Sequence, residues 1–359
     1  MPTPKFLEEV ILDINRFNNF DDFLQFNTPV GSVDQSLSNT LYGFNHQSHA
    51  TIMPANKDNY GFTFLTRPQL NLTSANLRNI RKFYNYLTKR EGYLHPYIRK
   101  MLDPRLSKGG VEVIESSLIN NKQGFIPVLT NTLKTVSGWP DMVLPTYTSQ
   151  QGLMKEQHAM GDGSMEIYDS YDLDLTFKNT KDEPIILMFQ LWIMYISYVF
   201  RGKMSPYIDF LRANEIDYNT RIYRLVMDEN KRFVKKVAAT GAAFPITVPS
   251  GKFFDYSSAT NYNDQTKDIN IRFKSMGAEY NDAITFLEFN EVSSIFNTRV
   301  RNMLDGELDH GLEKIPYNML DMLNYRGYPI INMRTSELEW WIESDSLTLG
   351  KLRSLREGV

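Results

Sequence analysis

The chain has 359 residues, of which 42% are hydrophobic and 13% aromatic, and this apolar content argues against global disorder. The formal net charge of −3 gives no overall basic footprint for nucleic acid, and the absence of cysteine excludes disulfides, thiolate catalysis and cysteine-based zinc sites. The N-terminus lacks the basic region and apolar core of a signal peptide, so we expect an intracellularly made, soluble protein.

Residues 1–105 are expected to form a mainly helical extension that precedes a β-rich core. Apolar side chains recur at helical spacing over residues 5–25, whereas residues 26–60 are rich in Asn, Ser, Gly and Gln and favour irregular structure. A short strand is expected at 60–65, followed by a helical segment over 75–102 that one glycine and one proline divide.

The segment 75–102 is also the most basic part of the chain, and tyrosines are interleaved with its charges. Basic and aromatic side chains together favour contact with a phosphate backbone and stacking on bases. A solvated helix face, or a face that contacts an acidic partner chain, explains the same pattern. The candidate DNA contacts are Arg78, Arg81 and Lys82.

Residues 106–295 are expected to form the β-rich core around one central helix. Short strands are predicted at 110–114 and 124–129. Residues 135–168 form a long polar connection, which is typical of a functional loop or an interface arm. Two further strands flank residues 228–231 and predict a β-hairpin.

An almost wholly apolar run over residues 184–200 fits either a membrane span or a buried helix. The run rises only ~25 Å as a helix, short of the ~30 Å hydrocarbon core of a bilayer, which favours the buried helix. Its flanking strands offer a sheet for it to cover, and its few polar residues share one narrow face where a neighbouring subunit could lie. This stripe comprises Glu183, Gln190, Ser197 and Arg201, and the interface candidates are Gln190 and Arg201.

The densest acidic cluster lies before the apolar run, and its spacing does not match a calcium-binding loop. Asp172 and Asp174 alternate with leucines and therefore occupy the solvent face of one strand. A solvated face explains them, and the sharper hypothesis is that they line an acidic channel that repels passing nucleic acid. The cluster comprises Asp162, Glu166, Asp169, Asp172 and Asp174.

Residues 296–359 are expected to form a C-terminal helical arm. Large aromatic side chains outside regular core patterns often fill pockets of a partner, although packing within their own domain explains them nearly as well. The candidate anchors of this kind are Trp139, Trp340 and Trp341.

No sequence feature gives positive support for an enzyme, and we predict no catalytic, cofactor-binding or metal-binding residues. The chain lacks glycine-rich phosphate-binding motifs and the Gly-x-Ser-x-Gly motif of serine hydrolases. His46 and His49 could bind a metal weakly, but no third ligand is placed beside them. A cell-wall hydrolase that uses Asp169 and Asp172 remains an alternative, because two-carboxylate sites leave little local signature.

Over residues 165–290 the order of strand, turn, helix and paired strands resembles the tail-tube proteins of contractile-tailed bacteriophages and the tube-initiating proteins of their baseplates. The segments that carry this resemblance are 173–177, 189–192, 205–207, 217–218, 222–226, 244–245 and 269–273. The residues outside this region make the chain longer than a plain tube subunit requires, which suits a baseplate or tail-terminus adaptor.

The resemblance implies an α+β fold in which an antiparallel β-barrel or sandwich carries one packed helix. It also implies a structural virion protein that forms or caps a ring of the tail tube or baseplate, with six as one possible number of subunits. Other tail proteins would be its partners, and DNA could pass through the ring. A neck, connector or capsid-associated virion protein is the nearest alternative.

Overall fold

The computed structural model describes residues 59–88, 93–106, 112–114, 118–163, 169–255, 258–259, 262, 266–307, 311–321 and 325–344. Several sequence expectations lie outside these residues, namely the helical spacing over 5–25, the pair His46 and His49, Glu166 of the acidic cluster, and the part of the expected C-terminal arm after residue 344.

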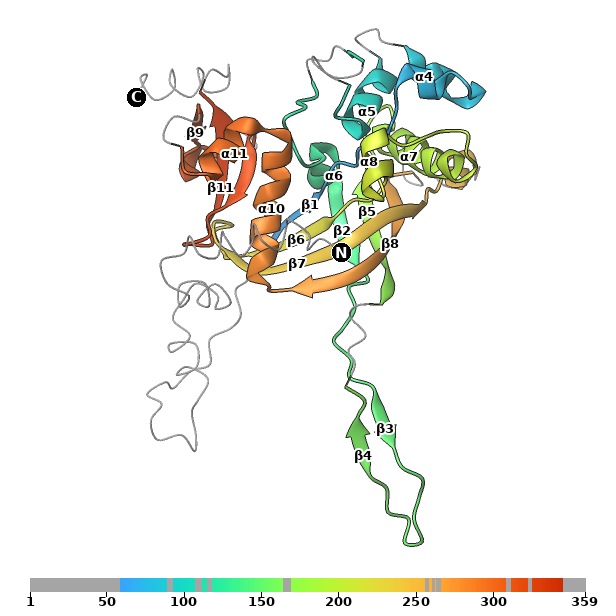
Figure 1. Cartoon of the computed structure of the whole chain (residues 1–359), viewed down its shortest axis with the longest axis vertical. Coiled ribbons are helices and arrows are strands. Elements are labelled where there is room, and N and C mark those ends of the chain that lie inside the picture. The colour runs from blue at the N-terminus through green and yellow to red at the C-terminus, as the bar shows by residue number, and fades with distance from the viewer. Residues whose placement is uncertain are drawn as a thin grey trace.

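An antiparallel sheet of six strands, curled into a half-barrel, forms the centre of the fold (Figure 1). Every neighbouring pair of strands in it is antiparallel. In spatial order the strands are β1 (Asn59–Leu65), β6 (Ile222–Met227), β7 (Val234–Thr247), β8 (Asp268–Tyr280), β5 (Ser170–Lys178) and β2 (Leu133–Ser137).

The sheet confirms the strand at 60–65 and the hairpin around residues 228–231, which joins β6 to β7. The amide of Lys231 donates to the carbonyl of Asp228, and the Asp228 side chain accepts from the amides of Arg232 and Phe233. Because β1 pairs with β6, a segment of the expected N-terminal extension belongs to the same sheet as the β-rich core.

Helix α7 (Pro184–Phe200) has the bounds that the apolar run predicts. Phe189 and Trp192 pack against Phe273 of the sheet, with ring centroids 5.7 and 6.5 Å away. On its other side α7 meets the N-terminal helices, where the Tyr86 hydroxyl donates to the carbonyl of Leu187 at 3.2 Å. A helix covered on both sides is apolar almost all round, which explains its composition. No helix in the described part of the chain is long and apolar enough to cross a membrane.

The basic segment is divided, as expected, but into three short pieces. They are α4 (Ser74–Leu77), the 3-10 helix η1 (Arg81–Leu87) and α5 (Leu94–Leu102). Pro96 does not break a helix here, because it lies in the first turn of α5, where its missing N–H has no intrahelical acceptor to lose.

The prediction of a strand at 124–129 is wrong, because residues from Pro127 onward form helix α6 (Pro127–Thr132). Proline at the first helical position favours this start. Of the strand expected at 110–114, only residues 112–114 are described, and they form no strand.

The C-terminal segment is not mainly helical in the residues that the structure describes. Two helices, α10 (Ala283–Phe296) and α11 (Thr298–Leu304), are followed by a three-stranded sheet of β9 (Leu312–Lys314), β10 (Tyr328–Ile331) and β11 (Leu338–Glu343). The sequences of β10 and β11 are rich in isoleucine and aromatic residues, which favour strands, and they pair directly with each other.

Two large apolar clusters hold these layers together, and a third, smaller one lies between α11 and the C-terminal sheet. The first joins the N-terminal helices, α7 and strands β5 and β8, and the second joins α10, strands β1, β6 and β7 and the C-terminal sheet. Leu65 belongs to the first cluster and Phe64 to the second, because successive side chains of a strand point to opposite faces.

Residues 138–163 leave this body as a long arm, formed by the hairpin of β3 (Thr146–Thr148) and β4 (Ala159–Gly161) (Figure 1). The remaining short elements are α8 (Ile208–Ala213) and the 3-10 helices η3 (Gly251–Phe254) and η4 (Tyr317–Met319).

Candidate assembly surface

The β3–β4 arm, residues 138–163, presents large apolar side chains that its own chain leaves uncovered. Seven such side chains lie on it, with Leu153 fully exposed and Met154 88% exposed at the tip. A two-stranded hairpin with no packed face is at best marginally stable in water. The arm is therefore the part of the described surface with the strongest need for a partner. These seven are Met142, Val143, Leu144, Tyr147, Leu153, Met154 and Met160.

Hydrogen bonds shape the tip of the arm into a defined turn. The amide of Gly152 donates to the carbonyl of Glu156 at 2.9 Å, and the amide of Lys155 donates back to the carbonyl of Gly152 at 3.0 Å. The Glu156 carboxylate accepts from the amide of Met154 at 2.8 Å. The turn thus holds Leu153 and Met154 outward without any contact to the body of the chain.

Trp139 anchors the base of the arm. Its ring packs against Tyr171 and Tyr280, with centroids 6.3 and 6.1 Å away, and the Tyr280 hydroxyl donates to the carbonyl of Pro140 at 2.5 Å. Burial raises the pKa of both tyrosines. Gly138 precedes this anchor at φ +104°, and a Cβ there would meet the carbonyl oxygen of Asp172 at 2.2 Å, so only glycine fits. The candidate anchor Trp139 is therefore half-buried in its own chain and fixes the direction of the arm.

The central sheet has two edge strands, β1 and β2, each with one neighbouring strand among the described residues. Lys134 lies on β2 and makes an ion pair with Asp268 of β8. A charged lysine on an edge strand discourages indiscriminate pairing, while the backbone groups of the edge remain available to a matching strand.

The acidic residues of β5 form a ladder of ion pairs with β8. Asp172 contacts Lys274 at 2.9 Å and Asp174 contacts Arg272 at 2.9 Å, and each pair lies directly opposite in the strand register. The hydrogen bond and charge of Asp174 raise the pKa of Arg272. The face is solvent-exposed, as the alternation predicts, but it is charge-balanced rather than simply acidic. Whether it lines a channel stays a prediction.

The residues of the polar stripe of α7 differ in their burial and in their hydrogen bonds. The Gln190 side chain is half-buried and donates from Nε2 to Ser250 Oγ at 2.8 Å. Arg201 is exposed at the C-terminal cap of the helix, where its amide donates to the carbonyl of Ser197. Arg201 is thus available to a neighbour, and Gln190 is already engaged on one side.

Trp340 and Trp341 lie on adjacent positions of β11. Trp340 belongs to the second apolar cluster, whereas Trp341 packs against a small third cluster formed by Val300, Leu312, Tyr328 and Ile330. Trp340 is 6% exposed and packs edge-on against Phe62 and Tyr325, with centroids 5.8 and 5.5 Å away. Trp341 is half-buried and donates from Nε1 to Glu339 at 3.0 Å. Trp340 serves the core of its own chain, and the period-two alternation of a strand explains why only one of the pair is fully covered.

The candidate DNA contacts Arg78, Arg81 and Lys82 are exposed around η1, whereas Arg99 of the same basic segment is buried. Arg99 pairs with Glu112 at 2.8 Å, and its Nε donates to the carbonyl of Leu72. Part of the positive charge of this segment therefore stabilises the fold and is not on the surface.

A buried polar network, which the sequence patterns did not reveal, joins the N-terminal helices to the rest of the fold. Asp103 accepts from the amide of Leu72 at 2.9 Å and from the Tyr207 hydroxyl at 2.8 Å. Burial raises the pKa of Asp103 to about 6. Arg67 donates to the carbonyls of Met101 and Lys100, and burial lowers its pKa to about 10. Asp-Pro at 103–104 and Arg-Pro at 67–68 were the only local signals, and neither specifies a partner.

Among the described residues, no group of three or more His, Asp or Glu side chains could hold a metal ion. The features that stand out are instead an apolar arm, the two edge strands of the central sheet and an exposed sheet face. Such features are typical of a structural protein that assembles with other chains.

Comparison with protein families identifies the class of structural protein more closely. Residues 12–352 match the model of a family described as "putative phage tail tube protein", and the chain belongs to this family. It is a structural protein of the phage tail and a component of the virion. A search of curated proteins found no match.

Three solved structures have distant similarity to this chain. The anti-feeding prophage tube-terminating cap shares 14% identity over 47% of this chain and 94% of its own, with a TM-score of 0.27. The sheath/tube terminator of an extracellular contractile injection system shares 11% identity over 41% of this chain and 84% of its own, with a TM-score of 0.24. The sheath–tube complex of that system shares 12% identity over 41% of this chain and 79% of its own, with a TM-score of 0.24.

Proposed function

We propose that copies of this chain close into a ring of the tail tube, or a ring that caps it, by pairing β1 of one copy with β2 of the next. The proposal rests on the order and direction of the strands in the central sheet. Six strands joined by antiparallel pairings place two edge strands of opposite direction at its ends. A neighbouring β1 beside β2 therefore continues the antiparallel order without interruption.

The contact between two different edges is heterologous, and a heterologous contact generates a closed ring when its rotation closes. The curl of each sheet supplies rotation in one direction (Figure 1). Strand pairing would also satisfy the backbone donors and acceptors that the edges leave to water. On β1 this excludes the carbonyl of Leu65, which already accepts from the amide of Ile126, so a neighbouring strand would pair with the part of β1 before Leu65.

The ladder-bearing face of β5 and β8 is our candidate for the lumen. Each acid of the ladder is neutralised by a base on the adjacent strand, so this face offers DNA neither a continuous cationic track nor a strongly repulsive one. Such a surface would let a polyanion pass without retaining it. Replacing Asp172 and Asp174 by asparagine would leave unpaired bases and should slow DNA passage while rings still form. Unchanged passage would count against a lumen-facing role.

Engineered cysteines test the ring directly, because the chain has no cysteine of its own. Tyr60 on β1 and Thr135 on β2 are both exposed. The double variant Tyr60→Cys with Thr135→Cys, treated with a short bis-maleimide, should give a ladder of covalent multimers that ends at the ring number. The matched control pairs Tyr60→Cys with Glu215→Cys, which is exposed on the segment after α8.

Mass measurement of the uncross-linked protein, alone and with other tail proteins, completes this test. Rings seen in negative stain together with edge-specific cross-links are the expected outcome. Rings that form with no more cross-linking between the edges than in the control would overturn the pairing of β1 with β2. A chain that stays monomeric under all these conditions would overturn the ring itself. The position of the ring in whole particles would separate a tube, baseplate or cap role from a neck or capsid-associated one.

A further inference from the structure

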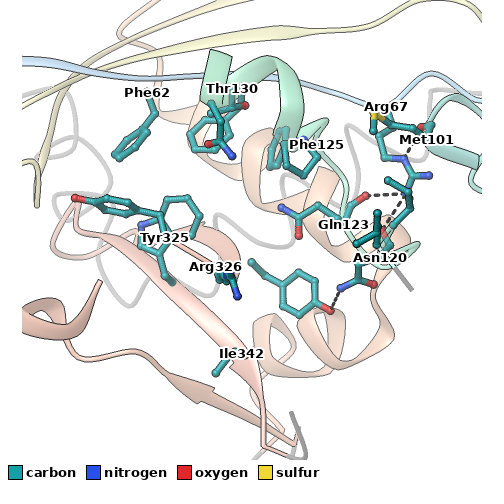
Figure 2. A pocket seen from close by; sticks show the side chains of 18 of the residues that line it. Phe62, Arg67, Met101, Asn120, Gln123, Phe125, Thr130, Tyr325, Arg326 and Ile342 are labelled. Atoms are coloured by element: carbon teal, nitrogen blue, oxygen red, sulfur yellow. Dashed lines mark hydrogen bonds between the residues drawn. The ribbon is translucent and has the colours of Figure 1, made fainter. Parts of the chain in front are cut away.

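A cleft with an aromatic floor lies between β1, α6 and the C-terminal sheet (Figure 2). Its volume is about 530 Å³. Phe64, Phe125 and Trp340 are almost fully buried and line its interior, while Asn131 and Arg326 at its rim are exposed. The proposed ring makes no use of this cleft.

The chemistry of the cleft suits a short peptide turn with long, flexible apolar side chains. Aromatic rings make favourable contacts with methionine sulfur, and an unbranched side chain can enter an irregular gap. Amide side chains of Gln123 and Asn131, which line the cleft, can bind the backbone of such a turn, whereas the amide of Asn120 is already hydrogen-bonded to Tyr328 and Lys122.

The tip of the β3–β4 arm has these properties. Leu153 and Met154 are presented together on a hydrogen-bonded turn and have no cover in their own chain. The adjacent Glu156 is acidic, while Arg326 at the rim of the cleft is basic.

The cleft and the arm lie at opposite ends of the same strand. Helix α6, which lines the cleft, runs directly into the first residue of β2, and the arm departs after the last residue of β2. Figure 1 shows the arm pointing away from α6 and the C-terminal sheet. The arm therefore cannot fill the cleft of its own chain, but it can reach the cleft end of a second copy stacked in the same orientation.

We propose that the arm of one copy inserts Leu153 and Met154 into the aromatic cleft of a copy in the next ring. This inference rests on the proposed ring, because rings stacked head to tail place every arm beside the cleft end of a neighbour. The occupant is a second copy of this chain, and the contact holds consecutive rings together.

A cysteine pair tests the insertion without changing the inserted side chains. Lys155 is next to them on the tip, and Asn131 lies on the rim of the cleft. In assembled tubes, Lys155→Cys with Asn131→Cys should give intermolecular cross-links at least about tenfold above the control pair Lys155→Cys with Glu215→Cys, because docking raises the effective concentration of the two thiols into the millimolar range.

A second pair of variants tests the stacking itself. Leu153→Asp with Met154→Asp should still form single rings, judged by the cross-links between β1 and β2, but should lose tubes longer than one ring. Gln150→Asp with Gln151→Asp places the same charge on neighbouring exposed positions of the arm and should stack normally.

Each result is decisive for one of the two proposals. Stacked rings without specific tip-to-cleft cross-links, or normal stacking of the double variant Leu153→Asp with Met154→Asp, would overturn the insertion and leave the ring intact. Failure of every variant and of the unmodified chain to form rings would overturn the proposed function, and the insertion with it.

Discussion

Helix α7 and the β3–β4 arm both carry large apolar side chains, but those of α7 are mostly buried and those of the arm are exposed to water. The side chains of α7 lie between the sheet and the N-terminal helices, and Trp192 is completely buried. Those of the arm lie in water, and Leu153 is completely exposed. The first region completes the fold of its own chain, whereas the second is left uncovered by its own chain. Hydrophobicity therefore shows that a segment needs burial, but not which molecule provides it.

The largest effect is expected where α7 meets the sheet. Trp192→Ala should lower the free energy of unfolding by about 3–5 kcal/mol, because it leaves a large cavity beside Phe189 and Phe273. Urea denaturation followed by circular dichroism would measure it. Leu153→Ala at the arm tip is the matched control and should change the stability of the monomer by less than about 0.5 kcal/mol. Similar losses of unfolding free energy in both variants would contradict this difference between α7 and the arm.

The stability of the body of the chain should also depend on pH. Burial raises the folded-state pKa of Asp103 to about 6 from an ordinary value of 3.8. The folded state therefore holds this proton more tightly, and its contribution to stability is present below pH 3.8 and is lost as the pH rises to about 6 and beyond. The shift corresponds to about 3 kcal/mol.

Asp103→Asn cannot ionise and should flatten this part of the stability profile between about pH 4 and 7. Denaturation midpoints of both proteins at each pH would measure the difference, with Asp209→Asn on exposed α8 as the control. An unaltered slope in the Asp103 variant would assign the pH dependence to other groups.

A smaller effect is expected at the base of the arm. Trp139→Ala removes contacts with Tyr171 and Tyr280 and should lower stability by about 1–2 kcal/mol, because Trp139 is only half-buried. The arm should lose its fixed direction, so limited proteolysis within residues 138–163 should become faster and stacking weaker. Proteolysis at an unchanged rate would show that the arm is held by other contacts.

The smallest effects on folding are expected on the polar stripe of α7. Gln190→Ala removes one hydrogen bond to Ser250 and should lower stability by about 1 kcal/mol, while Arg201→Ala should change it by less than about 0.5 kcal/mol. If a neighbour lies on this stripe, both variants should weaken ring formation in sedimentation experiments more than they weaken folding. Rings as stable as those of the unmodified chain would remove the stripe from the interface.

The sequence predicted best the elements whose pattern is strong and local. The alternating strand with Asp172 and Asp174, the apolar helix and the β6–β7 hairpin all formed where expected. Residues 124–129 did not form the expected strand, because a short apolar run fits both structures and the proline after Ile126 favours a helix start. The C-terminal strands were missed although β10 and β11 are consecutive along the chain and pair directly, because short apolar runs of this length fit a helix as well as a strand. Only the pairing of β9 with β11 is long-range.

The candidate surface was only partly predictable for the same reason. The polar composition of residues 135–168 indicated an interface arm, but not that Leu153 and Met154 would form its tip. Nothing local in the sequence links Arg67 to Lys100 or Asp103 to Tyr207, because these partners are brought together only by the packing of whole elements. Trp340 and Trp341 illustrate the limit, since the sequence could not tell which of the two the core would cover.

The even number of strands in the central sheet also constrains how proteins of this plan can diverge. With six antiparallel strands the two edges run in opposite directions. Adding or removing a single strand would make them run in the same direction, and the proposed junction between copies would become parallel. Adding or removing a whole hairpin preserves the junction. Relatives that keep this mode of assembly should therefore differ in strand number by twos, and single-strand changes should coincide with a different way of joining copies.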